Sequence, residues 1–206
     1  MARTRVGVLI SGRGSNMEAL VRAAAAADYP AEIALVLSNE PEAAGLGIAA
    51  GMGVAVAAVD HRGFRGDREA HERAMDAVLA QHGVELVCLA GYMRRLTPWL
   101  VERWRGRMLN IHPSLLPAFP GLHTHERAIA AGVRVHGCTV HLVTEGVDEG
   151  PILAQAAVAV RENDDAASLG ARVLTEEHRL YPLALARRLG GEVAGVAGSP
   201  EVLLAV

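Results

Sequence analysis

Lysine is absent from this 206-residue chain, and all 20 of its basic residues are arginine. The absence excludes a Schiff-base lysine, a lysine-linked pyridoxal phosphate and the lysine of a Walker-type phosphate loop. The arginines are scattered and the formal net charge is −3, so we expect no nucleic-acid partner.

Cysteine is nearly as scarce, and long apolar runs are missing. Cys88 and Cys138 both lie in strand-like apolar segments, which favours buried free thiols over a disulfide or a cysteine metal site. No apolar stretch reaches transmembrane length, and the first residues lack the apolar core of a signal peptide. We therefore expect a cytoplasmic protein without a membrane partner.

Apolar strand-like segments alternate with helix-like segments through most of the chain. Because each strand is apolar throughout, the pattern predicts a parallel sheet covered by helices on both faces. The strands are expected over 4–12, 31–39, 54–60, 84–91 and 107–113, and the helices over 15–27, 43–53, 67–83 and 97–104.

The pattern changes after a short helical segment at 125–132. Residues 135–143 and 151–160 alternate more strictly and are joined by an acidic turn, which predicts an antiparallel edge. A long helix over 166–190 follows, and the tail over 191–206 predicts at most one edge strand. The fold class is therefore α/β, a mostly parallel, doubly wound sheet with an antiparallel edge towards the C-terminus, in one domain over 1–206.

A glycine-rich turn, SGRGSN at 11–16, follows the first predicted strand. Its glycines let the backbone approach a ligand, and the next helix offers free N–H groups to an anion such as phosphate. Ser15 and Asn16 could cap that helix and add donors. An ordinary strand-to-helix turn fits equally well. The turn is not a dinucleotide-binding fingerprint, because the third glycine is missing.

A second motif, MLNIHPSLLPAFPG at 108–121, ends the fifth predicted strand. Asn110 and His112 are two residues apart, so they share one face at the carboxyl edge of the sheet, where such folds bind ligands. A histidine there can carry a proton, and an asparagine amide can stabilise an oxyanion. The alternative is a histidine bonded to a loop carbonyl and an asparagine that caps the turn.

Other titratable groups give weaker signals. Asp148 lies on the acidic turn, and if that turn folds over the fifth strand it could orient His112 and stabilise its protonated form. His123, His125, His136 and His141 match no standard zinc spacing, so we expect no metal.

Four segments together resemble the phosphoribosylglycinamide formyltransferases, a branch of the folate-dependent formyltransferases. These are LISGRGSN, AGYMRRLTP, NIHPSLLPAFPGLHTHERAI and HGCTVHLVTEGVDEGPILAQ. The resemblance implies transfer of a formyl group from 10-formyltetrahydrofolate to the amine of glycinamide ribonucleotide in purine synthesis. Asn110, His112 and Asp148 match the catalytic trio of the family. The N-terminal half would then hold the ribonucleotide, and the C-terminal half the folate and the catalytic groups.

The resemblance also assigns binding residues. Gly14, Ser15 and Asn16 match positions that hold the ribonucleotide phosphate, and Glu177 matches a carboxylate that binds the ribose hydroxyls. The folate cleft is matched by Asn110 and by Arg68, Met93, Arg94, Leu96 and Val143. The Leu116–Pro117 bond matches one that the family makes cis.

Two positions depart from the family pattern, and one related activity remains open. Leu174 replaces a frequent polar ribonucleotide contact, and Arg95 replaces an aliphatic residue of the folate cleft. The alternative activity is hydrolysis of formyltetrahydrofolate. We expect neither the N-terminal regulatory domain of those hydrolases nor the C-terminal domain of tRNA formyltransferases, and a monomer or homodimer acting on small molecules.

Overall fold

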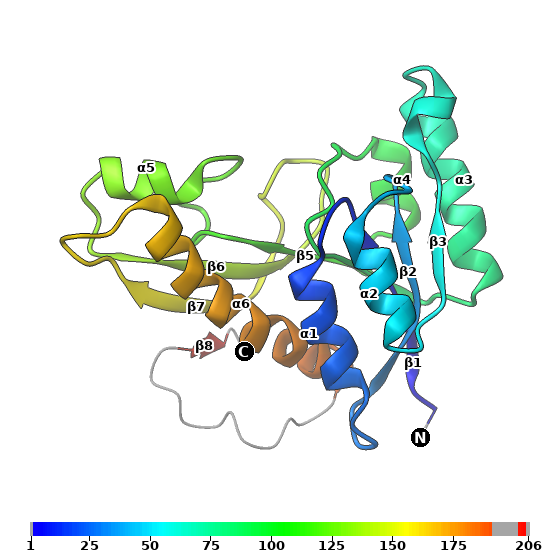
Figure 1. The fold of residues 1–206 in the computed structure, drawn as a ribbon, viewed down its shortest axis with the longest axis horizontal. Coiled ribbons are helices and arrows are strands. Elements are labelled where there is room, and N and C mark those ends of the chain that lie inside the picture. The colour runs from blue at the N-terminus through cyan, green and yellow to red at the C-terminus, as the bar shows by residue number, and fades with distance from the viewer. Residues whose placement is uncertain (1, 191–201, 205–206) are drawn as a thin grey trace.

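The computed structural model describes residues 2–190 and 202–204. Its strands form one eight-stranded sheet in the order β3-β2-β1-β4-β5-β6-β7-β8 (Figure 1). The strand bounds are β1 Thr4–Ile10, β2 Ala31–Ser38, β3 Val56–Ala58, β4 Leu86–Leu89, β5 Met108–His112, β6 Val135–Leu142, β7 Ile152–Ala159 and β8 Val202–Leu204. The helix bounds are α1 Ser15–Ala24, α2 Ala44–Gly51, the 3₁₀ turn η1 His61–Phe64, α3 Arg68–Gln81, α4 Pro98–Arg103, α5 Thr124–Ala130 and α6 Ala166–Arg188.

The direction of the strands changes at β5. The five strands from β3 to β5 run parallel, whereas the β5–β6, β6–β7 and β7–β8 pairs are antiparallel. This confirms the predicted fold class. The strand predicted over 54–60 is shorter than expected, since only Val56–Ala58 pairs with β2 at the sheet edge. The predicted edge strand in the tail is β8; residues 191–201 and 205–206 lie outside the described residues.

Both faces of the sheet are covered, which accounts for the unbroken apolar strands. On β1, Val6, Val8 and Ile10 belong to one core cluster together with buried residues of α1 and α6. The intervening Leu9 belongs to a second cluster with Met75 of α3. Thus α1, α2 and α6 lie on one face, and α3 and α4 lie on the other (Figure 1).

Tyr181 of α6 fixes the position of that helix against the middle of the sheet. Its side chain is fully buried, and its hydroxyl lies 3.0 Å from the carbonyl of Leu89 and 3.1 Å from that of Leu109. The two carbonyls belong to the neighbouring strands β4 and β5, so the contact sets α6 beside the strand that carries Asn110 and His112. Among the described residues, no helix is long and apolar enough to cross a membrane.

Candidate active site

The two polar residues of β5 stand where the sheet changes from parallel to antiparallel. β5 pairs with β4 on one side and with β6 on the other, where Asn110 lies opposite His141 and His112 opposite Thr139. Side chains two apart on a strand share a face, so Asn110 and His112 project together. His112 is buried, with only 6% of its surface exposed, and Asn110 is partly buried.

Asp148 does fold over β5, as the sequence suggested. Its Oδ2 atom lies 3.3 Å from Nδ1 of His112 and accepts a hydrogen bond from the Gly121 amide at 2.9 Å. The other ring nitrogen of His112 lies 3.1 Å from the Phe119 carbonyl. Asp148 holds φ = 57°, a left-handed conformation that is costly for a residue with a side chain. Three separate loop and strand segments therefore meet at one imidazole.

His141 is a further member of this cluster that sequence reasoning considered only as a metal ligand. Its Nδ1 lies 2.9 Å from the Leu142 carbonyl, which can only accept, so this nitrogen carries the hydrogen. Its Nε2 then accepts from Nδ2 of Asn110 at 3.2 Å and lies 3.7 Å from Oδ1 of Asp148. The register of β5 and β6, which no local pattern reveals, brings His141 to this place.

Burial decides the resting charge of His112. It lowers the pKa of the ring below its ordinary value, although the Phe119 carbonyl and the Asp148 carboxylate act in the opposite direction. Asp148 thus favours the protonated ring, as expected, but burial outweighs it in the absence of substrates. Burial also raises the pKa of Asp148, but the neighbouring His141 side chain, the hydrogen bond from the Gly121 amide and His112 together outweigh it and lower that pKa overall. Asp148 is thus ionised beside a neutral imidazole.

Buried hydrogen bonds pin the loop that follows β5. Thr139 of β6 donates to the Ser114 carbonyl at 2.7 Å and accepts from the Leu116 amide at 3.0 Å. Gln155 of β7 donates to the Leu116 carbonyl at 2.8 Å. The Leu116–Pro117 bond is cis, as expected. Neither Thr139 nor Gln155 stood out in the sequence, because their partners lie 16 to 39 residues away.

The glycine-rich turn leads into α1 differently from the predicted cap. Gly14, at φ = 69°, occupies the cap position, and no side chain there bonds the helix N-terminus. Ser15 is the first helical residue. Asn16, expected as a cap, instead donates from Nδ2 to the Glu177 carboxylate of α6 at 2.6 Å. The first-turn N–H groups of α1 consequently keep no side-chain cap, as an anion-binding turn requires.

Asn16 and Glu177 form a buried polar pair across the two helices. Asn16 is 8% exposed, and its Oδ1 has no hydrogen-bond partner in the described part of the chain. Burial raises the pKa of Glu177, while the bond from Asn16 lowers it by a smaller amount. The sequence places these residues 161 positions apart, and the structure brings them together.

The residues assigned to the folate cleft lie around the ends of β4 and β6. Met93 and Arg94 are on the loop after β4, where the Met93 amide donates to Ser11 at 2.8 Å. Leu96 and Val143 pack against the second core cluster, the one that contains Leu9 and Met75. Arg68 is the first residue of α3, and its positive charge acts to lower the pKa of Glu72. The Glu72 carboxylate in turn accepts a hydrogen bond from the Thr97 amide at 2.8 Å, at the end of the loop after β4. Met93 is 68% exposed and Arg95 is exposed as well.

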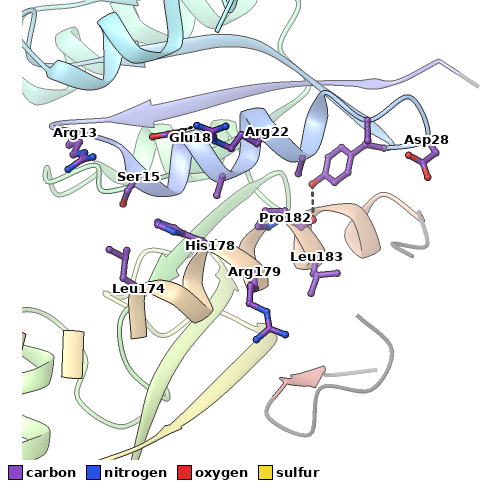
Figure 2. Close-up of a pocket in the computed structure, with 14 residues that line it drawn as sticks. Arg13, Ser15, Glu18, Arg22, Asp28, Leu174, His178, Arg179, Pro182 and Leu183 are labelled. Carbon is purple, nitrogen blue, oxygen red and sulfur yellow. Dashed lines mark hydrogen bonds and ion pairs between the residues drawn. The ribbon is translucent and has the colours of Figure 1, made fainter. Parts of the chain in front are cut away.

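A cavity of about 770 Å³ lies between α1 and α6 (Figure 2). It is lined by Arg13, Ser15 and Leu174 at one end, and by Asp28 and Leu183 at the other. Asn110, His112 and Asp148 do not line it. The cavity therefore lies along α1 and α6, and the catalytic candidates are not part of its wall. Within the described residues, no group of three or more His, Cys, Asp or Glu side chains is arranged to hold a metal ion.

Comparison with known proteins agrees with this geometry. The Formyl transferase family profile matches residues 4–185. The chain is 42% identical over 178 residues to the phosphoribosylglycinamide formyltransferase of Escherichia coli, covering 86% of this chain and 84% of that protein. It is 44% identical over 191 residues to the human trifunctional purine biosynthetic protein adenosine-3, covering 93% of this chain but only 19% of that protein. It thus spans between 13% and 20% of the length of the trifunctional relatives that it matches.

The fold is shared with solved structures over nearly the whole chain. The phosphoribosylglycinamide formyltransferase from Brucella melitensis is 55% identical, with a TM-score of 0.88 over 95% of this chain and all of that one. The glycinamide ribonucleotide transformylase 1 from Symbiobacterium toebii is 44% identical, with a TM-score of 0.89 over 98% of this chain and 94% of that one. On sequence, fold and site geometry together, the chain belongs to the formyl transferase family.

Proposed function

We propose that this protein transfers the formyl group of 10-formyltetrahydrofolate to the amine of glycinamide ribonucleotide, giving the formylated ribonucleotide and tetrahydrofolate. The observation that carries the proposal is the meeting of Asn110, His112 and Asp148 at the carboxyl edge of β5. The relatives that this chain matches over most of their own length are named phosphoribosylglycinamide formyltransferases, which supports glycinamide ribonucleotide as the acceptor. The reaction would be a step of purine synthesis. We further place the enzyme in the cytoplasm as one domain, monomeric or homodimeric, that acts on small molecules.

The ribonucleotide is assigned to the first turn of α1 and to α6. Gly14, Ser15 and Asn16 offer backbone N–H groups and a hydroxyl to the phosphate at the positive end of the helix dipole. Glu177 is assigned to the ribose hydroxyls, because Asn16 is the one side chain of the described residues that bonds its buried carboxylate. The Oδ1 atom of Asn16, which has no hydrogen-bond partner among the described residues, is a second acceptor for a ribose hydroxyl.

The folate is assigned to the loop after β4 and to the end of β6. Leu96 and Val143 present apolar surface, the exposed Met93 extends it, and Arg68 and Arg94 supply charge for an anionic tail. The folate supplies the formyl group to be transferred. Since Asn110 stands beside this cleft on β5, the formyl carbon can lie between the folate and the ribonucleotide. Holding both substrates together removes much of the entropic barrier to their reaction.

Asn110 is assigned to the formyl oxygen. One hydrogen of its amide is used by His141, so the other is available to the oxygen as it gains negative charge during attack. The bond to His141 also fixes the orientation of the amide before the reaction starts. Such preorganised donors are effective because they need not reorient as the charge develops.

His112 and Asp148 are assigned to the proton. Both ring nitrogens of His112 face acceptors, the Phe119 carbonyl and the Asp148 carboxylate, while burial keeps the ring neutral at rest. The neutral imidazole would therefore be able to accept the proton that the attacking amine releases. From there it can pass to the departing folate nitrogen, and the imidazolium would meanwhile stabilise the oxyanion beside Asn110.

An assay with 10-formyltetrahydrofolate, run with and without glycinamide ribonucleotide, tests the proposal. We expect rapid appearance of tetrahydrofolate only when the ribonucleotide is present, with formylated ribonucleotide formed in equal amount. Folate release that is independent of the ribonucleotide would instead establish the hydrolase. No turnover with either acceptor would refute both.

A further inference from the structure

The ribonucleotide phosphate poses a charge problem that the assigned residues do not solve. A phosphate monoester carries nearly two negative charges at neutral pH, while a helix N-terminus supplies only about half a positive charge. Gly14, Ser15 and Asn16 bring no formal charge of their own. The facing wall of the cavity carries Leu174, which is apolar and 36% exposed. A cation elsewhere along the cavity would add the formal positive charge that these residues lack.

Most cationic side chains along the cavity are unsuited to this role. Arg22 forms an ion pair with Glu18 on its own helix, and Arg179 lies 3.1 Å from the Glu176 carboxylate. Burial lowers the pKa of His178, which leaves that ring uncharged at neutral pH. Arg13 differs from these three. It is exposed and forms no hydrogen bond or ion pair with any described residue.

The backbone holds Arg13 at the phosphate end of the cavity. The Gly45 amide of α2 donates to the Gly12 carbonyl at 3.1 Å. A Cβ atom at Gly45 would lie 2.8 Å from the Arg13 carbonyl oxygen, so α2 packs directly on this turn. Figure 2 shows Arg13 beside Ser15, across from Leu174, at the end of the cavity remote from Asp28. The guanidinium thus stands next to the uncapped first turn of α1 with no carboxylate bound to it.

We propose that Arg13 binds the ribonucleotide phosphate and makes the enzyme select a phosphorylated acceptor. Its guanidinium would form charge-assisted hydrogen bonds with phosphate oxygens held by the Ser15 turn. The cation therefore comes from the strand-to-helix turn, on the wall opposite Leu174. This inference rests on the proposed function for the identity of the acceptor, but the phosphate site can be tested without it.

Steady-state kinetics of three variants test the role of Arg13. Arg13→Gln is expected to raise KM for glycinamide ribonucleotide by about 10- to 100-fold, the usual size of a charged hydrogen bond, with kcat and KM for the folate nearly unchanged. Arg13→Lys should recover most of the loss. Arg22→Gln is the matched control, since Arg22 lines the same cavity but is paired with Glu18.

A relocated charge gives a second, independent readout. Adding Leu174→Arg to Arg13→Gln places a guanidinium on the opposite wall, and we expect the double variant to regain part of the affinity for the ribonucleotide. Equal KM increases in Arg13→Gln and Arg22→Gln would mean that any lost positive charge near the cavity weakens binding to the same extent. That result would overturn the proposal. An unchanged KM in Arg13→Gln would overturn it directly.

Titration calorimetry with ribose 5-phosphate separates this proposal from the proposed function. Wild-type protein should bind ribose 5-phosphate more tightly than ribose, and Arg13→Gln should lose most of that preference. This result would uphold the phosphate site even if glycinamide ribonucleotide were not the acceptor. The absence of any preference in the wild-type protein would refute the role of Arg13, whatever the assay of activity shows.

Discussion

Asn110 has two amide hydrogens, and the fold uses only one of them. The hydrogen bond to His141 orients the amide, and His112 is oriented in the same way by Phe119 and Asp148. Asn110 therefore keeps one amide hydrogen for a substrate, whereas both ring nitrogens of His112 face acceptors of the protein. This is the arrangement expected where a transient charge has to be stabilised without reorganisation.

Loss of either group should abolish most activity without unfolding the protein. For Asn110→Ala and for His112→Ala we expect kcat to fall by about 10²–10³-fold, the usual cost of one oxyanion donor. Circular dichroism should show the wild-type fold. His82→Ala is a suitable control, because His82 lies at the end of α3 and bonds the Val78 carbonyl. Near-normal turnover in either active-site variant would contradict the assigned mechanism.

Among the elements, β6 and β7 act as the support of the loop after β5. The Thr139 hydroxyl is fully buried and bonds the Ser114 carbonyl, the Leu116 amide and the Gln155 side chain. Because this loop leads to Phe119 and Gly121, the same hydroxyl indirectly positions the partners of His112 and Asp148. An antiparallel edge thus serves the site by fixing a loop.

Thr139→Val should destabilise the protein and slow turnover. The substitution keeps the shape but removes the hydroxyl that bonds the Ser114 carbonyl and the Leu116 amide, at a cost of about 1–3 kcal/mol. Urea denaturation gives the change in stability, and kcat reports on the loop. Thr175→Val is the matched control, since Thr175 is exposed and, among the described residues, bonds only the Ala171 carbonyl of its own helix. Equal stability losses in the two variants would argue against a supporting role for Thr139.

Helix α2 supports the glycine-rich turn by a close approach at Gly45. A methyl group there would lie 2.5 Å from Cδ1 of Ile10 and 2.9 Å from the Gly12 carbonyl oxygen, so Gly45→Ala should cost about 1–3 kcal/mol through overpacking. KM for the ribonucleotide should rise, because the turn has to move. Thermal unfolding and kinetics measure both effects.

Gly47 provides the control for that experiment on the same helix. Apart from its chain neighbours and the backbone of its own helix, no described residue has an atom within 4 Å of a Cβ placed at Gly47, so Gly47→Ala should raise stability by up to about 1 kcal/mol. A destabilisation of similar size at both glycines would mean that alanine destabilises α2 at any position. The close contacts at Gly45 would then not explain the loss of stability.

For the molecule as a whole, buried histidines make stability depend on pH. Burial lowers the pKa of His71, His112, His125, His136 and His178, and that of His136 falls to about 4. Each of these rings takes up a proton more readily in the unfolded chain, so the free energy of unfolding should fall as pH drops below about 6.5. Glu72 and Glu177 act in the opposite sense, because burial raises their pKa.

His136→Gln should isolate the largest part of this dependence. Between pH 6.5 and about 4 the unfolded chain binds a proton at His136 that the folded protein does not, worth about 3 kcal/mol over the whole interval. Denaturation curves at pH 7, 6, 5 and 4 should show a smaller loss of stability in the variant than in the wild type. Parallel losses in both proteins would exclude His136 as the source.

Local patterns in the sequence were sufficient for the secondary structure and the class of fold. Continuous apolar strands predicted the parallel part, because both faces of each strand had to be buried, and stricter alternation predicted the antiparallel edge. The shared face of Asn110 and His112 follows from strand geometry alone. These features depend only on residues that are close together in the chain.

Tertiary packing decided the features that involve distant residues. The contact of Asp148 with His112, the bond between Asn110 and His141, and the pairing of Asn16 with Glu177 in place of a helix cap all depend on how separate elements meet. The resting charge of His112 likewise depends on the burial of its ring. Desolvation and long-range register are properties of the folded molecule, because they arise from neighbours that the linear order of residues does not specify.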